Sequence, residues 1–74
     1  MEQYKNLEGH SGVTAYKIAA ESIVVTFING DTYLYTYESA GKNAVEKMKR
    51  FARTGKGLST YISQHVRGHF KEKF

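Results

Sequence analysis

Residues 23–37 read IVVTFINGDTYLYTY, in which two runs rich in β-branched and aromatic side chains flank the pair Asn29-Gly30. Runs of this composition favour β-strands because such side chains pack well on a pleated surface. An Asn-Gly pair between two such runs is a strong signal for the tight turn of a hairpin, since both residues tolerate positive φ angles. The stretch therefore predicts an antiparallel β-hairpin at the centre of the fold.

The register of this hairpin depends on the length of its loop. A two-residue turn at Asn29-Gly30 would place Val25 opposite Leu34 and would mix apolar side chains with threonines on each face. A three-residue loop with Gly30 at positive φ places Val25 opposite Tyr33 instead and makes one face uniformly apolar. We predict the three-residue loop, because burial of one face selects its register strongly. The residues expected on the buried face are Ile23, Val25, Phe27, Tyr33 and Tyr35.

The flanking sequence adds one strand before the hairpin and helices after it. Residues 13–18 alternate side chains with the period of a first strand. Apolar side chains recur at helical spacing in residues 44–52, and Gly55 follows where a helix often ends in a left-handed residue. A second helical pattern covers residues 59–67. The spacing of Asn43 and Glu46 is that of a capping box, which would start the first helix.

These elements predict one α+β domain, a three-stranded antiparallel β-meander packed against one or two C-terminal helices. We assign this β-β-β-α(-α) domain to residues 13–70. Residues 1–12 are polar and punctuated by glycine, so we interpret them as a flexible N-terminal lead-in. Residues 71–74 read as a basic tail.

Charge is distributed unevenly along the 74 residues. Up to Gly41 the sequence has two lysines against five acidic residues, whereas from Lys42 onward it has nine cations against Glu46 and Glu72. A half-chain this basic indicates an anionic partner such as a nucleic acid. The alternative is a solvated helix face that keeps a small protein in solution.

The composition also limits the class of protein. There is no cysteine, so neither disulfides nor a thiolate zinc site can stabilise the fold. The first residues lack the pattern of a signal peptide, and no apolar run is long enough to cross a bilayer. We therefore expect a soluble, cytoplasmic protein that needs no cofactor and no membrane.

The hairpin resembles the core of the KTSC domain, a small module named for the C-terminus of some lysyl-tRNA synthetases, with a Tyr-x-Tyr pair as its hallmark. Tyr16 and Ile62 also match that family, as does Ala52-x-x-Gly55, so the likeness covers most of residues 13–70. The valine-proline pair that usually opens the family's helix is missing. RNA binding is the function usually suggested for the family, and the resemblance implies a scaffold of this kind with an RNA partner. The pattern that carries the likeness is Ile23-x-Val25-x-Phe27-x-Asn29-Gly30-x-x-Tyr33-x-Tyr35.

A basic helix face is the main functional signal in the sequence. Its cations project opposite the apolar stripe of the first predicted helix, and Glu46 at i+4 can pair with only one of them, Arg50. The others would be free to contact phosphates with salt-sensitive, sequence-independent affinity. The candidate nucleic-acid-binding or anion-binding residues are Lys47, Lys49, Arg50, Arg53, Lys56 and Arg67.

Two further motifs favour a structural interpretation. Residues 55–60 read GKGLST, which could present backbone N–H groups to an anion but lacks the upstream glycine of a P-loop. We favour a helix–turn–helix connector with a serine cap. His65 and His69 have the spacing of metal ligands on one helix face, but both fall within the apolar stripe of the second helix. We therefore expect half-buried histidines and no metal.

The tyrosines have two possible roles, as base-stacking platforms or as core residues. Strand parity places Tyr33 and Tyr35 beneath the helices, so we interpret this family motif as structural. Tyr37 and Tyr61 are better candidates for exposure.

The sequence lacks the motifs of an enzyme. No arrangement of acids, serines or histidines matches a catalytic motif, and so small a domain has little room for a closed pocket, so we do not expect an enzyme. The predicted function is a small non-enzymatic binding module for RNA or another nucleic acid. The main alternative is a protein-interaction or structural accessory module with a protein partner. Binding of the basic helix to a membrane surface is a more distant one.

Overall fold

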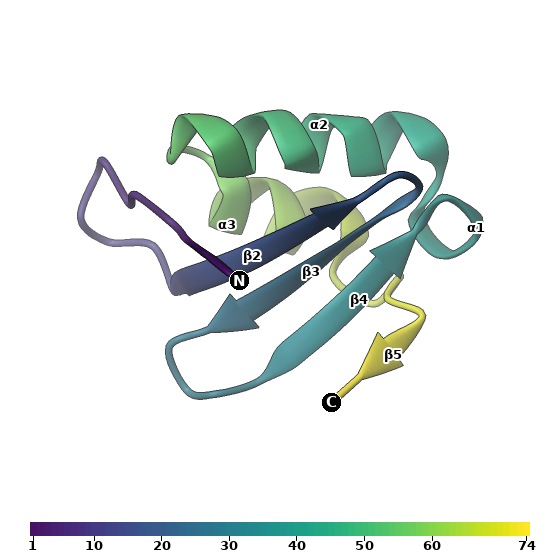
Figure 1. Cartoon of the computed structure of the whole chain (residues 1–74), viewed down its shortest axis with the longest axis horizontal. Helices are drawn as coiled ribbons and strands as arrows, with labels where there is room; N and C mark the ends of the chain where they lie inside the picture. The colour runs from purple at the N-terminus through teal and green to yellow at the C-terminus, as the bar shows by residue number, and fades with distance from the viewer.

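The computed structural model describes residues 1–74 as an antiparallel sheet with α2 and α3 on one of its faces (Figure 1). The strands lie in the order β1-β2-β3-β4-β5. This confirms the predicted α+β class. None of the helices combines the length and apolar character needed to cross a membrane. In chain order the elements are β1 (Glu2–Gln3), β2 (Val13–Ala19), β3 (Ser22–Phe27), β4 (Thr32–Thr36), α1 (Tyr37–Ala40), α2 (Lys42–Thr54), α3 (Leu58–Tyr61), the π-helix η1 (Ile62–Val66) and β5 (Glu72–Lys73).

The sheet is wider than the sequence predicts. The expected three-stranded meander corresponds to β2, β3 and β4, but the sheet has five strands. At one edge β1 pairs with β2 and places Glu2 opposite Tyr16. At the other edge β5 pairs with β4 and places Lys73 opposite Tyr33. The segments interpreted as a lead-in and a tail therefore each supply an edge strand.

The hairpin of β3 and β4 has the predicted register. Val25 lies opposite Tyr33 and Ile23 opposite Tyr35. The backbone N–H of Phe27 donates to the carbonyl of Asp31 at 2.8 Å, which closes a three-residue loop, and Gly30 within it has φ +92°. Such a φ angle is costly for a side chain with a Cβ atom, so glycine suits this loop.

One hydrophobic core fills the space between the sheet and the helices. Tyr35 is 1% exposed and lies at its centre. Tyr33 is half-buried at the rim, where its ring centroid lies 5.6 Å from that of Phe27 and 4.9 Å from that of Phe70. The buried apolar residues are Tyr4, Val13, Tyr16, Ile23, Val25, Tyr35, Val45, Met48, Ala52, Leu58, Ile62 and Val66.

The N-terminal segment belongs to this core. Tyr4 is only 4% exposed, and its hydroxyl oxygen accepts a hydrogen bond from the N–H of Leu58 at 3.3 Å. The N–H of Leu7 donates to the carbonyl of Gly55 at 2.8 Å. Residues 4–7 therefore contact the connection between α2 and α3, a contact that the polar composition of residues 1–12 did not predict.

The capping box lies one element earlier than predicted. The Thr36 hydroxyl accepts from the N–H of Ser39 and the Ser39 hydroxyl accepts from the N–H of Thr36, both at 3.0 Å, at the start of α1. The sequence pattern missed this single-turn helix. α2 then begins directly after Gly41 with no side-chain cap, so the box expected at Asn43 and Glu46 does not form.

The end of α2 and the buried side chains of α3 and η1 agree with the predicted apolar pattern. α2 ends at Gly55, which has φ +83° and whose N–H donates to the carbonyl of Phe51. Leu58, Ile62 and Val66 are buried along α3 and η1. The two histidines expected within that stripe and half-buried, His65 and His69, are instead exposed. This prediction was wrong because His65 lies off the line of the buried side chains and His69 comes after the end of η1.

Candidate nucleic-acid interface

Three cations lie along the exposed side of α2. Lys47, Arg50 and Arg53 are all exposed. They follow one another at intervals of three residues, so each is displaced about 4.5 Å along the helix axis from the one before. None of the three forms a salt bridge, since the ion pairs of the structure are Lys49–Glu46 and Lys73–Asp31. We call Lys47, Arg50 and Arg53 the basic row.

Lys49 does not belong to this row, although the sequence placed it there. It is 5% exposed and its stem lies along the core edge of α2. Its Nζ atom donates to the carbonyl oxygen of Ala20 at 2.9 Å and lies 2.9 Å from Glu46 Oε2. The cation is thus used to join α2 to the turn between β2 and β3, and it is not available to a ligand.

Glu46 is held away from the basic row by the same cluster. The Tyr37 hydroxyl donates to Glu46 Oε2 at 2.7 Å, and Lys49 contacts that oxygen from within α2. The hydrogen bond from Tyr37, followed in size by that from Lys49, lowers the pKa of the Glu46 carboxyl. The same bond to Glu46 raises the pKa of the Tyr37 hydroxyl. The predicted pairing of Glu46 with Arg50 is therefore wrong, and Arg50 keeps its charge unpaired.

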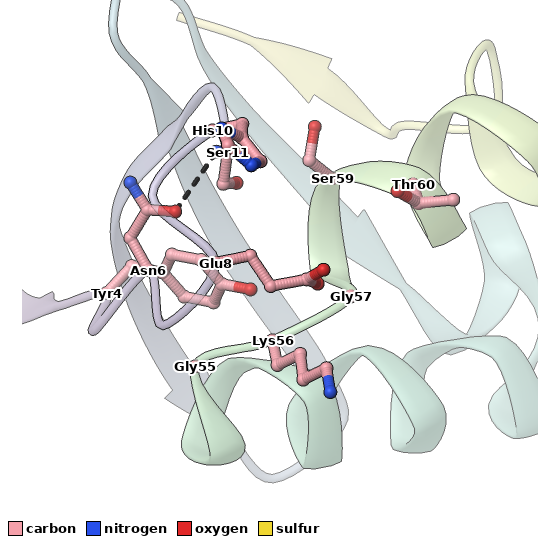
Figure 2. Close-up of a pocket in the computed structure, with 10 residues that line it drawn as sticks. All are labelled: Tyr4, Asn6, Glu8, His10, Ser11, Gly55, Lys56, Gly57, Ser59 and Thr60. Carbon is pink, nitrogen blue, oxygen red and sulfur yellow. Dashed lines mark hydrogen bonds between the residues drawn. The ribbon is translucent and has the colours of Figure 1, made fainter.

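Lys56 lies beyond the C-terminus of α2, in the connector to α3. This exposed residue lines a polar pocket of about 140 Å³ formed between the connector and the N-terminal loop (Figure 2). The loop is folded by a hydrogen bond from the N–H of Ser11 to Asn6 Oδ1 at 3.0 Å. Figure 2 shows the Glu8 side chain extending from this loop toward Gly57. An acid therefore lies in the pocket beside the lysine, which makes the pocket a poor match for a phosphate.

The backbone of the connector is already engaged within the protein. The N–H groups of Gly55 and Lys56 donate to the carbonyl of Phe51, and that of Leu58 donates to the Tyr4 hydroxyl. These three N–H groups are not available to an anion, which agrees with the connector interpretation of the GKGLST motif. The expected serine cap is missing, because Gly57 is the N-cap residue of α3 and offers no side chain.

Arg67 lies apart from the other candidates. It is exposed after the end of η1 and lines a shallow hollow of about 180 Å³. Tyr33 and Tyr35 also line that hollow. Of the predicted residues, the structure thus groups the basic row on α2, with Lys56 just beyond its end, and separates Lys49 and Arg67 from it.

A ladder of aromatic rings, which the sequence interpretation did not assemble, connects α2 with the following helices. The ring centroids of Phe51 and Tyr61 lie 5.4 Å apart, and Tyr61 stacks on His65 at 4.6 Å. The guanidinium carbon of Arg50 lies 5.6 Å from the centroid of Phe51. The spacing of Tyr61 and His65 at i and i+4 was the available signal. Their meeting with Phe51 depends on how the helices pack.

Other chemistry has little support in the arrangement of side chains. No group of three or more histidine, aspartate or glutamate side chains is placed to hold a metal ion. Comparison of the chain with models of protein families, with curated proteins and with solved structures gives no match.

Proposed function

We propose that the chain is a small, non-enzymatic, cytoplasmic binding module for RNA or another nucleic acid, and that the basic row on α2 is its contact surface. The observation that carries the proposal is the absence of any acidic partner for Lys47, Arg50 and Arg53. Glu46, the acidic residue of α2, is engaged by Tyr37 and Lys49. An unpaired row of cations attracts the phosphates of a nucleic acid and gains free energy by releasing their counterions.

The resemblance of the hairpin to the KTSC domain supports the same proposal, because RNA binding is the role suggested for that family. We propose membership of that family on the pattern that includes Tyr33 and Tyr35. Because Tyr35 is buried and Tyr33 lies at the rim of the core, the pair supports the scaffold and leaves binding to the surface of α2.

A titration of labelled RNA and DNA at several salt concentrations tests the proposal. Contacts from the three cations of the basic row to a single strand should give a slope of about −2 in a plot of log K against log salt. The double reversal Arg50→Glu with Arg53→Glu should abolish binding at moderate salt. A matched control is Lys71→Glu with Lys73→Glu, which changes the net charge equally on exposed residues of the C-terminal segment, outside α2.

Two results would contradict the proposal. One is a lack of binding to any strand at low salt. The other is an equal loss of binding in both double variants, which would show that only the net charge matters.

The alternative function is a protein-interaction or structural accessory module. The observation in its favour is the sheet face that α2 and α3 leave uncovered in Figure 1. On that face Val24 lies opposite Leu34, and both are only half-buried. A protein partner whose binding is lost in Leu34→Lys and kept in the α2 double reversal would favour this alternative.

A further inference from the structure

The aromatic ladder formed by Phe51, Tyr61 and His65 ends at the surface. Phe51 and Tyr61 are half-buried, whereas His65 is exposed. The rings of Tyr61 and His65 are nearly parallel, with an interplanar angle of 30°, and their centroids lie 4.6 Å apart. A stack of this kind holds the outer ring in place, and because His65 is exposed, its ring is accessible to another flat group.

The local helix geometry explains why the ladder forms. Residues 62–66 form a π-helix, whose turns are wider than those of an α-helix. Wider turns bring side chains four residues apart closer to a single line along the helix, which places His65 over Tyr61. The same spacing aligns Leu58, Ile62 and Val66 against the core. The buried stripe therefore fixes the ladder on the neighbouring side of the helix, because Tyr61 and His65 each directly precede a residue of that stripe.

The ladder runs beside two members of the basic row, Lys47 and Arg50. After the connector, α3 turns back beneath α2, and both α3 and η1 contact it (Figure 1). Arg50 precedes Phe51 in α2, and its guanidinium carbon lies 5.6 Å from the ring centroid. Lys47 lies four residues before Phe51 and therefore one turn back along the same side of the helix. Lys47 and Arg50 thus lie next to the stacked rings, whereas Arg53 lies farther round α2, where it lines a hollow together with Lys17.

We propose that this ladder is a stacking platform for unpaired bases and that the chain prefers single-stranded to double-stranded nucleic acid. The inference rests on the proposed function and specifies its substrate class. Unpaired bases can continue a stack of rings on His65 while their phosphates meet the basic row. The bases of a duplex are already stacked on one another and would gain nothing from the ladder. Any base has a flat face, so we expect little sequence preference.

The test compares strands that carry the same phosphates with and without bases. The probes are a labelled RNA 20-mer, a DNA duplex and an abasic single strand of the same length. His65→Ala should weaken binding of the RNA about fivefold or more, the range expected for one stacked base, and should leave binding of the abasic strand unchanged. His69→Ala is a matched control, because His69 is another exposed histidine with no place in the ladder.

A second variant reports on stacking directly. The chain contains no tryptophan, so His65→Trp introduces a single indole at the end of the ladder. Its fluorescence should be quenched by the RNA 20-mer and unaffected by the abasic strand, and the variant should keep the affinity for RNA that His65→Ala loses.

The outcomes separate the two proposals. Equal affinity for the RNA and the abasic strand, or equal behaviour of His65→Ala and His69→Ala, would overturn the stacking platform. If the α2 double reversal still abolished binding in that case, the proposed function would stand. Failure of every strand to bind at low salt would overturn both.

Discussion

Lys49 joins three parts of the chain at one atom. Its stem is buried at the edge of α2, and its Nζ atom reaches the carbonyl of Ala20 and the carboxylate of Glu46, each at 2.9 Å. A long lysine side chain can bury its methylenes and still bring its charge to polar partners. The ring centroid of Tyr37 lies 5.5 Å from the same Nζ atom and completes the cluster.

Replacing Lys49 should affect stability and spare binding. Lys49→Met keeps the packing of the stem but removes the charged donor to Ala20, so we expect the free energy of unfolding to fall by about 1–2 kcal/mol. Lys47→Met, at an exposed position without a salt bridge, should change stability by less than about 0.5 kcal/mol and should weaken binding of RNA. Urea denaturation and the RNA titration measure the two effects. The opposite pattern would place Lys49 in the contact surface.

Sequence patterns predicted single residues where the rule was local. Strand parity placed Val25 opposite Tyr33, because the turn is only a few residues away. The role of Lys49 could not be predicted in this way, since the carbonyl of Ala20 lies 29 residues earlier in the chain. The spacing rule for Glu46 and Arg50 likewise gave way to a partner outside the helix, Tyr37.

Two glycines show how helix ends depend on their surroundings. Gly55 ends α2 with φ +83°, and a Cβ atom built on it would lie 2.5 Å from the Cβ atom of Lys5. The N-terminal segment therefore passes directly over the end of the helix. Gly68 follows η1, and a Cβ atom at that position would meet no atom within 4 Å.

The contrast predicts opposite effects of adding one methyl group. Gly55→Ala should destabilise the fold by about 2 kcal/mol or more, because alanine is strained at this φ angle and its Cβ atom would displace the Lys5 backbone. Gly68→Ala should be neutral or slightly stabilising, since it restricts the unfolded chain without a clash. Thermal unfolding of the two variants compares them. Equal melting temperatures would contradict the close packing of Lys5 on α2.

The elements that the sequence missed are the shortest ones. β1 and β5 have two residues each and α1 has four, which is too short for any periodic pattern to be seen. They form because longer neighbours hold them in place, β1 against β2 and β5 against β4. The basic row, which lies on the 13-residue α2, was largely predictable for the opposite reason. The ladder was not, since it requires the packing of α3 and η1 on α2.

At the scale of the whole molecule, distant parts of the chain meet in one small core. Tyr4 comes from the N-terminal segment and Tyr35 from the central hairpin, and both belong to the same cluster of buried residues. A domain of this size is expected to unfold in one cooperative step, so a change at either tyrosine affects the stability of the whole. Burial raises the pKa of Tyr4, and it raises the pKa of Tyr35 to about 12.

These raised pKa values predict a loss of stability in alkali. An unfolded chain ionises its tyrosines near pH 10, at a lower pH than the buried Tyr35 of the folded chain. This ionisation lowers the free energy of the unfolded chain relative to the folded one. The contribution of the neutral Tyr35 hydroxyl to the free energy of unfolding is fully present below pH 10. It is lost as the pH rises through about 12, the pKa of Tyr35 in the folded chain. Tyr35→Phe should thus leave stability near pH 7 almost unchanged and retain more of it than the wild type at pH 11, as urea denaturation at each pH would show. Tyr4→Phe is the comparison, because it also removes the acceptor of the Leu58 N–H and should cost about 1 kcal/mol already at pH 7. Identical alkaline profiles of Tyr35→Phe and the wild type would mean that the Tyr35 hydroxyl ionises in the folded protein as freely as in the unfolded chain.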